Sequence, residues 1–187
     1  MGIGVSRRAT ALPPEERRAA IIEAVRPLLA EHGDSITTKQ IACAAGIAEG
    51  TIFRVFKDKD ELIGAAVDAA VDPQPLEDAL AAIDPELDFR DQLVAATEIM
   101  QRRTTEVWTL LSRVEQRTDR PPRPVHDSPT LAAIFAAHDD RVVVDPVRAA
   151  HLHRAITLAL THPMMSAEPA TAADIVSTLI DGIGTTT

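Results

Sequence analysis

The longest segment without a helix breaker sets the strongest limit on the fold of this chain. From Asp88 to Arg117 the sequence has neither proline nor glycine, and apolar residues recur at alternating intervals of three and four. That spacing is typical of the buried face of an α-helix, and a helix of this length would extend over roughly 45 Å. The stripe consists of Leu93, Ala96, Met100, Arg103, Val107, Leu110 and Val114, of which only Arg103 is charged.

The composition favours helices over strands. Only 3% of the residues are aromatic and none is tyrosine, whereas β-sandwiches and barrels are usually rich in aromatic residues. The single cysteine, Cys43, cannot form an internal disulfide, and no Cys-rich zinc pattern is present. No apolar run approaches the roughly 20 residues of a membrane span, and no secretory signal is visible. We therefore predict a cytosolic, all-α protein without a cofactor or a metal.

Prolines and glycines divide the remaining chain into shorter helices. Pro13 and Pro14 open the first, since proline is tolerated in the first helical turn, and Gly33 ends it. Pro27 lies inside this helix, where it removes one backbone hydrogen bond, and is expected to kink or split the helix. Further helices are expected over residues 37–45, 49–56, 58–71, 76–83, 129–138, 146–161 and 171–183.

Polar residues at fixed spacings mark where several of these helices begin. Thr37 and Gln40 have the spacing of a capping box, and Asp58 and Glu61 repeat it. Ser128 is placed to cap the helix that starts at residue 129.

The charge is unevenly distributed along the chain. The net charge is −9, but residues 1–60 carry nine Lys and Arg against eight Asp and Glu, whereas residues 61–187 carry ten against twenty. All three lysines lie in the first part. Because phosphate repels an acidic surface, any contact with DNA is expected to come from the N-terminal part. An acidic surface without any partner is the alternative from charge alone.

Residues 36–62 contain the strongest functional signal. Two short helices are joined by a turn at Gly46, which suits a left-handed backbone. The small residues Ala42 and Ala45 allow the helices to cross closely, and Ile52 and Phe56, with Ile47, are expected to pack them on the first helix. This arrangement predicts a helix-turn-helix, whose second helix enters the major groove of DNA.

Residues 15–70 resemble the DNA-binding domain of the TetR (tetracycline repressor) family. The resemblance implies an N-terminal three-helix head with a helix-turn-helix, followed by a C-terminal helical bundle that binds a ligand and dimerises. Three regions follow from it, namely a flexible arm (1–12) with Arg7 and Arg8, a DNA-binding domain (13–71) and a ligand and dimer domain (72–187). The matching residues are Leu28–Gly33, Thr37, Thr38, Ile41, Ala42, Ala45–Ile47, Gly50–Phe53 and Phe56–Leu62.

The resemblance also implies which side chains would touch DNA. Glu49, Gly50 and Thr51 would open the recognition helix and face base edges, with Gly50 allowing the backbone to approach closely. Arg54 points outward and is the candidate for a bidentate contact with guanine. Phe53 replaces the usual phosphate-bonding Tyr of the family, so it can only pack against sugar or protein.

Phosphate contacts are implied for three further residues. Thr38 at the start of the first motif helix would bond a phosphate, as would Lys59 at the start of the next helix, with Lys57 helping. Ala48 stands where the family usually has a capping Ser, at a cost of about 1 kcal/mol. Ala48 and Pro27 could each make the DNA-binding domain less stable.

The C-terminal region carries only a tentative ligand pocket. It would contain Met100, Arg103, Val107 and Trp108 and bind a small, largely apolar effector. Arg103 would meet an anionic ligand or, as the favoured alternative, pair with a carboxylate such as Glu98 or Glu106. The last two long helices are implied to form the homodimer interface, although their apolar residues could instead fill a monomer core. Those residues are Val147, Ala150, Ile156, Ala159, Ile175, Leu179, Ile180 and Ile183.

Two other features carry less weight. His151 and His153 are spaced like a metal pair, but side chains two residues apart on a helix point away from each other, so a shared ion is not expected. Cys43 is expected to be a surface residue without a redox partner.

The predicted function is a sequence-specific DNA-binding transcriptional regulator of the bacterial cytoplasm, associated with the nucleoid. It is expected to be a repressor that a small-molecule effector releases from a palindromic operator. The alternative is a helix-turn-helix interaction module that has lost sequence-specific DNA binding. An enzyme is not predicted, because no phosphate loop, nucleophile elbow or Cys–His pair is found.

Overall fold

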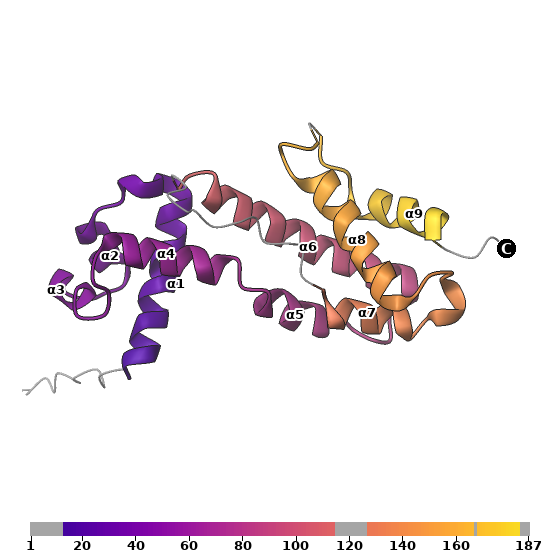
Figure 1. Ribbon diagram of the computed structural model, residues 1–187, viewed down its shortest axis with the longest axis horizontal. Helices are drawn as coiled ribbons and strands as arrows, with labels where there is room; N and C mark the ends of the chain where they lie inside the picture. The colour runs from indigo at the N-terminus through magenta and orange to yellow at the C-terminus, as the bar shows by residue number, and fades with distance from the viewer. Residues whose placement is uncertain (1–12, 115–126, 167, 184–187) are drawn as a thin grey trace, which may run out of the picture. The chain divides into compact units, whose positions relative to one another are not determined.

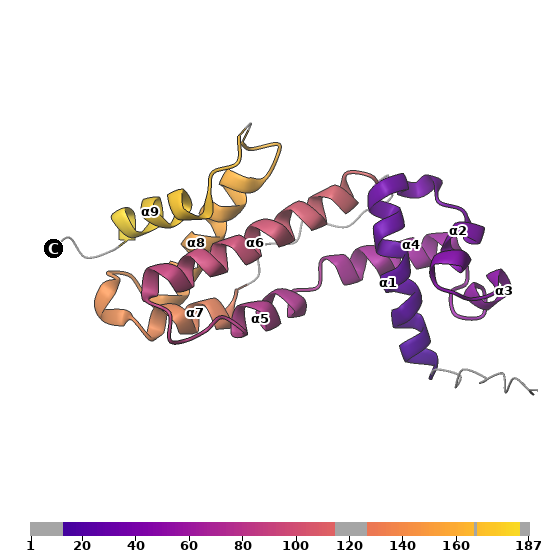
Figure 2. The same cartoon turned by 180° about the vertical axis from the view of Figure 1, so that it is seen from behind.

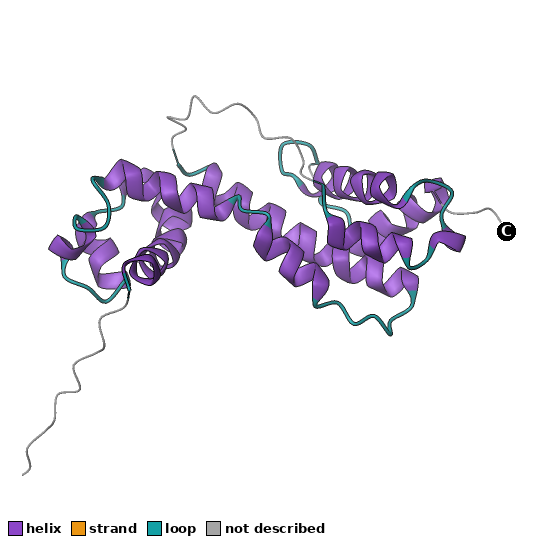
Figure 3. Ribbon diagram, turned by 60° about the horizontal axis from the view of Figure 1, so that its bottom comes forward, coloured by secondary structure: helices purple, strands orange, loops and turns teal. Residues whose placement is uncertain are grey.

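The computed structural model describes residues 13–114, 127–166 and 168–183, with side chains as far as Ile180. Helices and loops make up these residues, which contain no β-strand (Figure 3). The predicted all-α fold, with an N-terminal helix-turn-helix head and a helical C-terminal bundle, is confirmed. The predicted arm, with Arg7 and Arg8, lies outside the described residues.

The chain forms two compact units. The first extends to Ala70 and also takes in Arg113, and the second begins at Val71. The first contains α1 (Pro14–His32), α2 (Thr38–Ala44), α3 (Glu49–Ile52) and α4 (Lys59–Ala70). The second contains α5 (Gln74–Ala81), α6 (Phe89–Leu111), α7 (Pro129–Ala136), α8 (Pro146–Thr161) and α9 (Ala172–Ile183).

The core of the first unit forms where α1 packs on α4 and α2 (Figures 1 and 2). Helix α1 presents Ile21, Val25 and Leu29, which are spaced by four residues and therefore share one face. Most of the expected apolar residues of the motif are buried against them. The buried side chains of the other elements are Ile36, Ile41, Ala42, Ile52, Phe56, Leu62, Ile63, Ala66 and Ala70.

Helix α1 runs through Pro27 as one element. It starts at Pro14 as expected, but it is not split. Pro27 is exposed, so its ring faces solvent rather than the packed face. The helix ends at His32. The next residue, Gly33, has φ of 58°, which lies in the region that favours glycine.

The second unit is organised around α6. Helices α8 and α9 pack against α6 and against each other, while α5 and α7 pack together (Figure 1). The predicted stripe of α6 supplies much of the core, since Leu93, Ala96, Met100 and Leu110 are buried. The core is completed by Leu76, Leu80, Phe89, Leu131, Phe135, Ala149, Ala150, Val176 and Leu179.

Two helices are shorter than the sequence predicted. Helix α6 ends at Leu111 rather than Arg117, and the Ser112 hydroxyl donates to the Thr109 carbonyl in its last turn. Helix α3 ends at Ile52 rather than Phe56. After Ile52 the chain continues in turns, with Arg54 N–H donating to Thr51 and Val55 N–H to Ile52 over three residues.

Candidate nucleic-acid interface

Backbone and side-chain hydrogen bonds fix the two motif helices locally. Thr37 accepts from the Gln40 N–H, and the Gln40 side chain accepts from the Thr37 N–H, so the predicted capping box is present. At the other end of α2, Gly46 has φ of 64°. Its N–H donates to Cys43, and the Ile47 N–H donates to Ala42 at 3.0 Å, which together form a Schellman turn.

The turn places α3 with one face inward and one face outward. Ile52 and Phe56 are buried in the first unit. Glu49, Gly50 and Arg54 are exposed, and Thr51 is half-buried. Three of the four residues predicted to face base edges, Glu49, Gly50 and Arg54, are thus exposed to solvent, the first two in α3 and the third just after it.

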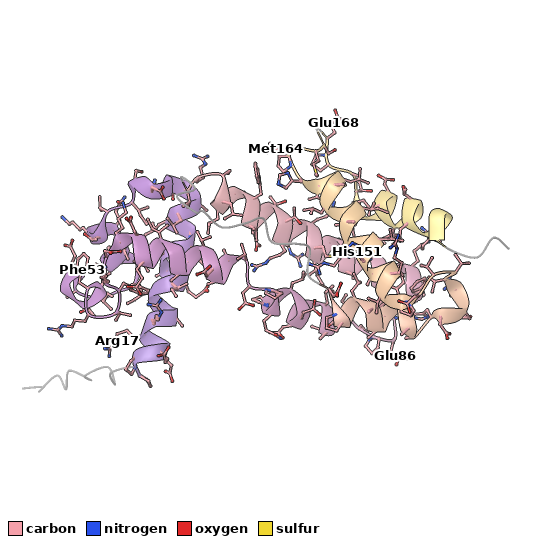
Figure 4. All side chains as sticks on the ribbon, viewed as in Figure 1. Arg17, Phe53, Glu86, His151, Met164 and Glu168 are labelled. Carbon is pink, nitrogen blue, oxygen red and sulfur yellow. The ribbon has the colours of Figure 1, made fainter. Side chains whose placement is uncertain are left out.

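Phe53 lies on the outer surface just after α3 (Figure 4). Half of this large apolar side chain, 50%, is exposed to solvent. An aromatic ring in that position can pack against deoxyribose or a thymine methyl group, but it has no hydrogen-bonding group for a phosphate. The predicted role as a packing residue stays a prediction.

Thr38 is engaged within the motif. Its hydroxyl donates to Oε1 of Glu49, which links the start of α2 to the start of α3. A hydroxyl has one hydrogen, so a bond from Thr38 to a phosphate requires that hydrogen to leave Glu49. No pattern in the sequence indicates this link, because the two residues are eleven positions apart.

The two lysines of the predicted phosphate contact have different surroundings. Lys57 is exposed, and its backbone N–H donates to Glu61 at 2.7 Å. Lys59 is half-buried, and its ammonium donates to the Asp34 carbonyl. An ammonium has three donors, so Lys59 keeps others for a phosphate.

Arg18 supports residues 49–56, which contain α3 and are called the recognition segment. Arg18 was not singled out from the sequence. Its guanidinium lies 4.3 Å from the centre of the Phe56 ring, and its Nη1 is 3.3 Å from Oε1 of Glu61. It thereby joins α1 to the end of the recognition segment and to α4. Only the tertiary fold brings these three residues together.

Comparison with known proteins identifies the first unit. Residues 21–66 match the sequence model of the family described as "Bacterial regulatory proteins, tetR family". These residues form a TetR-family domain. The resemblance inferred from the sequence is thereby confirmed for these residues, and the family is described as one of regulatory proteins.

Curated relatives match about a third of the chain. The HTH-type transcriptional repressor Rv3405c of Mycobacterium tuberculosis is 40% identical over 63 residues, which are 33% of this chain and 34% of that protein. An HTH-type regulator of Mycobacterium bovis matches equally. The chain thus spans about a third of the length of the curated relatives it matches.

Solved structures resemble both units. A TetR-family regulator from Haemophilus influenzae has a TM-score of 0.58 at 17% identity, over 91% of this chain and 98% of that one. A TetR regulator from Streptomyces coelicolor has a TM-score of 0.57 at 23% identity, over 91% and 99%. At these identities the likeness shows only the fold, which includes that of the helices that follow the TetR-family domain in the chain.

The tentative pocket residues lie along α6. Met100 is buried, whereas Arg103, Val107 and Trp108 are half-buried. Nη2 of Arg103 donates to the Asp72 carbonyl at 2.9 Å. The Trp108 ring meets His162 edge to face, with centroids 4.3 Å apart. Their role in ligand binding stays a prediction.

His153 is a buried polar residue of the second unit. Thr97 donates its only hydrogen to the Leu93 carbonyl, so its oxygen accepts from Nε2 of His153 at 2.7 Å. Burial lowers the pKa of His153 to about 3, so the ring is neutral near pH 7. His151, two residues away, is exposed, which agrees with the expected divergence of the pair.

The buried His153 makes stability depend on pH. Below pH 6.5 the unfolded chain takes up a proton that the folded protein excludes, so the free energy of unfolding falls. We expect it to fall by about 1.4 kcal/mol more between pH 7.5 and 5.5 in the wild type than in His153→Gln. Urea unfolding at both pH values measures this difference. His151→Gln is the control and should retain the wild-type dependence; an equal pH dependence in His153→Gln would contradict the assignment.

Three further observations bear on other functions. Among the described residues no group of three or more His, Cys, Asp or Glu could hold a metal ion. Over the same residues no helix is both long and apolar enough to cross a membrane. Cys43 is exposed, as expected.

Proposed function

We propose that the protein is a sequence-specific DNA-binding transcriptional regulator, with repression as its mode of action. The observation that carries the proposal is the exposure of Glu49, at the start of α3, and of Arg54, two residues after its end, within a domain that matches the TetR family. Such a regulator works in the bacterial cytoplasm at the nucleoid. Thr38, Lys57 and Lys59 would position the protein on phosphates, which fixes register without reading sequence.

The second unit would dimerise and respond to an effector. Ala150, Ile175 and Leu179 are buried in the unit's own core, whereas Val147 is exposed and Ile156, Ala159 and Ile180 are half-buried. We assign the latter residues of α8 and α9 to a homodimer interface; the side chain of Ile183 lies outside those described. Two recognition helices related by a twofold axis would read a palindromic operator. A small-molecule effector that prefers the unbound state would release it.

The proposal is tested by fluorescence anisotropy with DNA from immediately upstream of the protein's own gene, at about 0.15 M salt. A scrambled duplex of equal length is the competitor. A specific regulator should prefer the upstream duplex by about 10³-fold or more. Equal binding to both, repeated with a pool of genomic fragments, would support the interaction-module alternative.

The substitution Gly50→Ala distinguishes an effect on DNA binding from an effect on the stability of the fold. A Cβ added at this position meets nothing within 4 Å, so Gly50→Ala should leave the free energy of unfolding unchanged or slightly higher. If the backbone approaches DNA there, the added methyl group should weaken specific binding by about fivefold or more for each protomer, from an overpacking cost of roughly 1 kcal/mol or more. Anisotropy and urea unfolding of the same preparation measure both quantities. Unchanged affinity would remove Gly50 from the interface.

A further inference from the structure

Three polar atoms on one face of α8 are buried, and no described residue offers them a hydrogen bond. They are Nδ1 of His153, Oγ1 of Thr157 and Oγ1 of Thr161. The residues are spaced by four, so they follow one another along a single helical face for about 12 Å. Buried polar groups in proteins are nearly always hydrogen-bonded, so three in a row require an explanation. We call this set the α8 polar stripe.

Two contacts between α6 and α8 bracket the α8 polar stripe. His153 meets Thr97 in the first half of α6, and His162, the residue that follows α8, meets Trp108 near the end of α6. Met100 and Val107, both predicted pocket residues, lie between Thr97 and Trp108 along α6. The stripe therefore belongs to the same part of the second unit as the tentative pocket, but it lies on the other helix.

The hydrogen-bonding state of His153 limits what can bind there. When the Thr97 hydroxyl donates to the Leu93 carbonyl, Nε2–H of His153 donates to Thr97, and in this tautomer Nδ1 carries a lone pair and needs a donor. Burial keeps the ring neutral, so His153 supplies no positive charge for an anion. Arg154, the adjacent cation on α8, lies in the field of Glu77 and Asp127. A carboxylate against Nδ1 would place two electron pairs face to face.

We infer that the α8 polar stripe is the recognition site for a neutral, chiefly apolar small molecule with a hydroxyl or N–H donor. The donor would bind Nδ1 of His153, and the hydroxyls of Thr157 and Thr161 would bind polar atoms further along. The inference rests on the proposed function, since it names the chemical class of the effector. It adds residues of α8 to the pocket predicted from the sequence, which comprised Met100, Arg103, Val107 and Trp108 of α6.

The experiment uses the full chain and four probes with matched apolar bodies. The neutral donors are 1-octanol and 4-butylphenol, and the anions are octanoate and 4-butylbenzoate. Fluorescence of Trp108, the only tryptophan, reports binding without DNA, and thermal unfolding of the same samples confirms it. We expect at least one neutral donor to bind saturably and at least tenfold more tightly than its matched anion.

Variants locate the site. Thr157→Val removes a hydroxyl that no described group satisfies, so Tm of the free protein should not fall. The same variant should weaken binding of the neutral probe about fivefold or more, and His153→Leu should do likewise. Thr178→Val is the matched control, because its exposed hydroxyl on α9 already donates to Asp174. It should bind the probe like the wild type.

Three results would overturn the inference. The first is tighter binding of the anions than of the neutral donors, and the second is unchanged probe binding in Thr157→Val. The third is no saturable binding of either neutral donor, in which case ordered water would satisfy the polar atoms of the α8 polar stripe. Release of operator DNA is measured separately. Probe binding without DNA release would support the site while contradicting effector release, so the failures of the two proposals are distinguishable.

Discussion

Arg54→Ala should abolish the preference of the protein for its operator over scrambled DNA. A bidentate arginine–guanine contact contributes about 1–3 kcal/mol of discrimination, which corresponds to roughly 5- to 150-fold for each protomer. Because a palindromic site uses two copies of the contact, the loss from a dimer would be about the square of that factor. Anisotropy titrations of the specific and scrambled duplexes with wild type and variant measure it.

Arg102→Ala is the matched control for this experiment. It removes the same charge from an exposed position on α6 in the second unit, so the net charge of the two variants is identical. The control should keep the preference for the operator. If Arg54→Ala and Arg102→Ala weaken binding to both duplexes equally, Arg54 acts through charge alone and reads no base.

Gly33→Ala should be the most destabilising single substitution in the first unit that adds only a methyl group. The residue has φ of 58° and ψ of −146°, a conformation nearly restricted to glycine. An added Cβ would lie 2.2 Å from the backbone oxygen of Arg113, which belongs to the same unit. Conformational strain and overpacking together should lower the free energy of unfolding by about 3 kcal/mol or more. Urea unfolding followed by circular dichroism measures the change.

Substitutions at two other glycines distinguish the conformational strain from the overpacking against Arg113. Gly46 shares the positive φ, at 64°, but an added Cβ meets nothing within 4 Å. Gly46→Ala should therefore cost only the conformational strain, about 1–2 kcal/mol. Gly64 lies inside α4 in open space, so Gly64→Ala should stabilise the protein by up to about 1 kcal/mol. Equal losses for Gly33→Ala and Gly46→Ala would show that the contact with Arg113 contributes nothing.

The site was predictable where its geometry depends on neighbours in the sequence. The capping box of Thr37 and the left-handed turn at Gly46 each involve residues within five positions of one another. Because these residue types favour such local hydrogen bonds, the helix-turn-helix could be inferred from the sequence. The predicted end of α6 was less accurate, because the apolar stripe continues to Val114 although the helix ends at Leu111.

The sequence by itself determined an all-α chain, the starts of most helices and a helix-turn-helix of the TetR type. These features depend on residue spacing and on local hydrogen bonds. Only the tertiary structure decided the partners of Arg18, Thr38 and His153, because each partner is between 11 and 56 residues distant along the chain. Contacts of that kind form when helices pack, and no periodicity in the sequence records which polar side chains then meet inside the core.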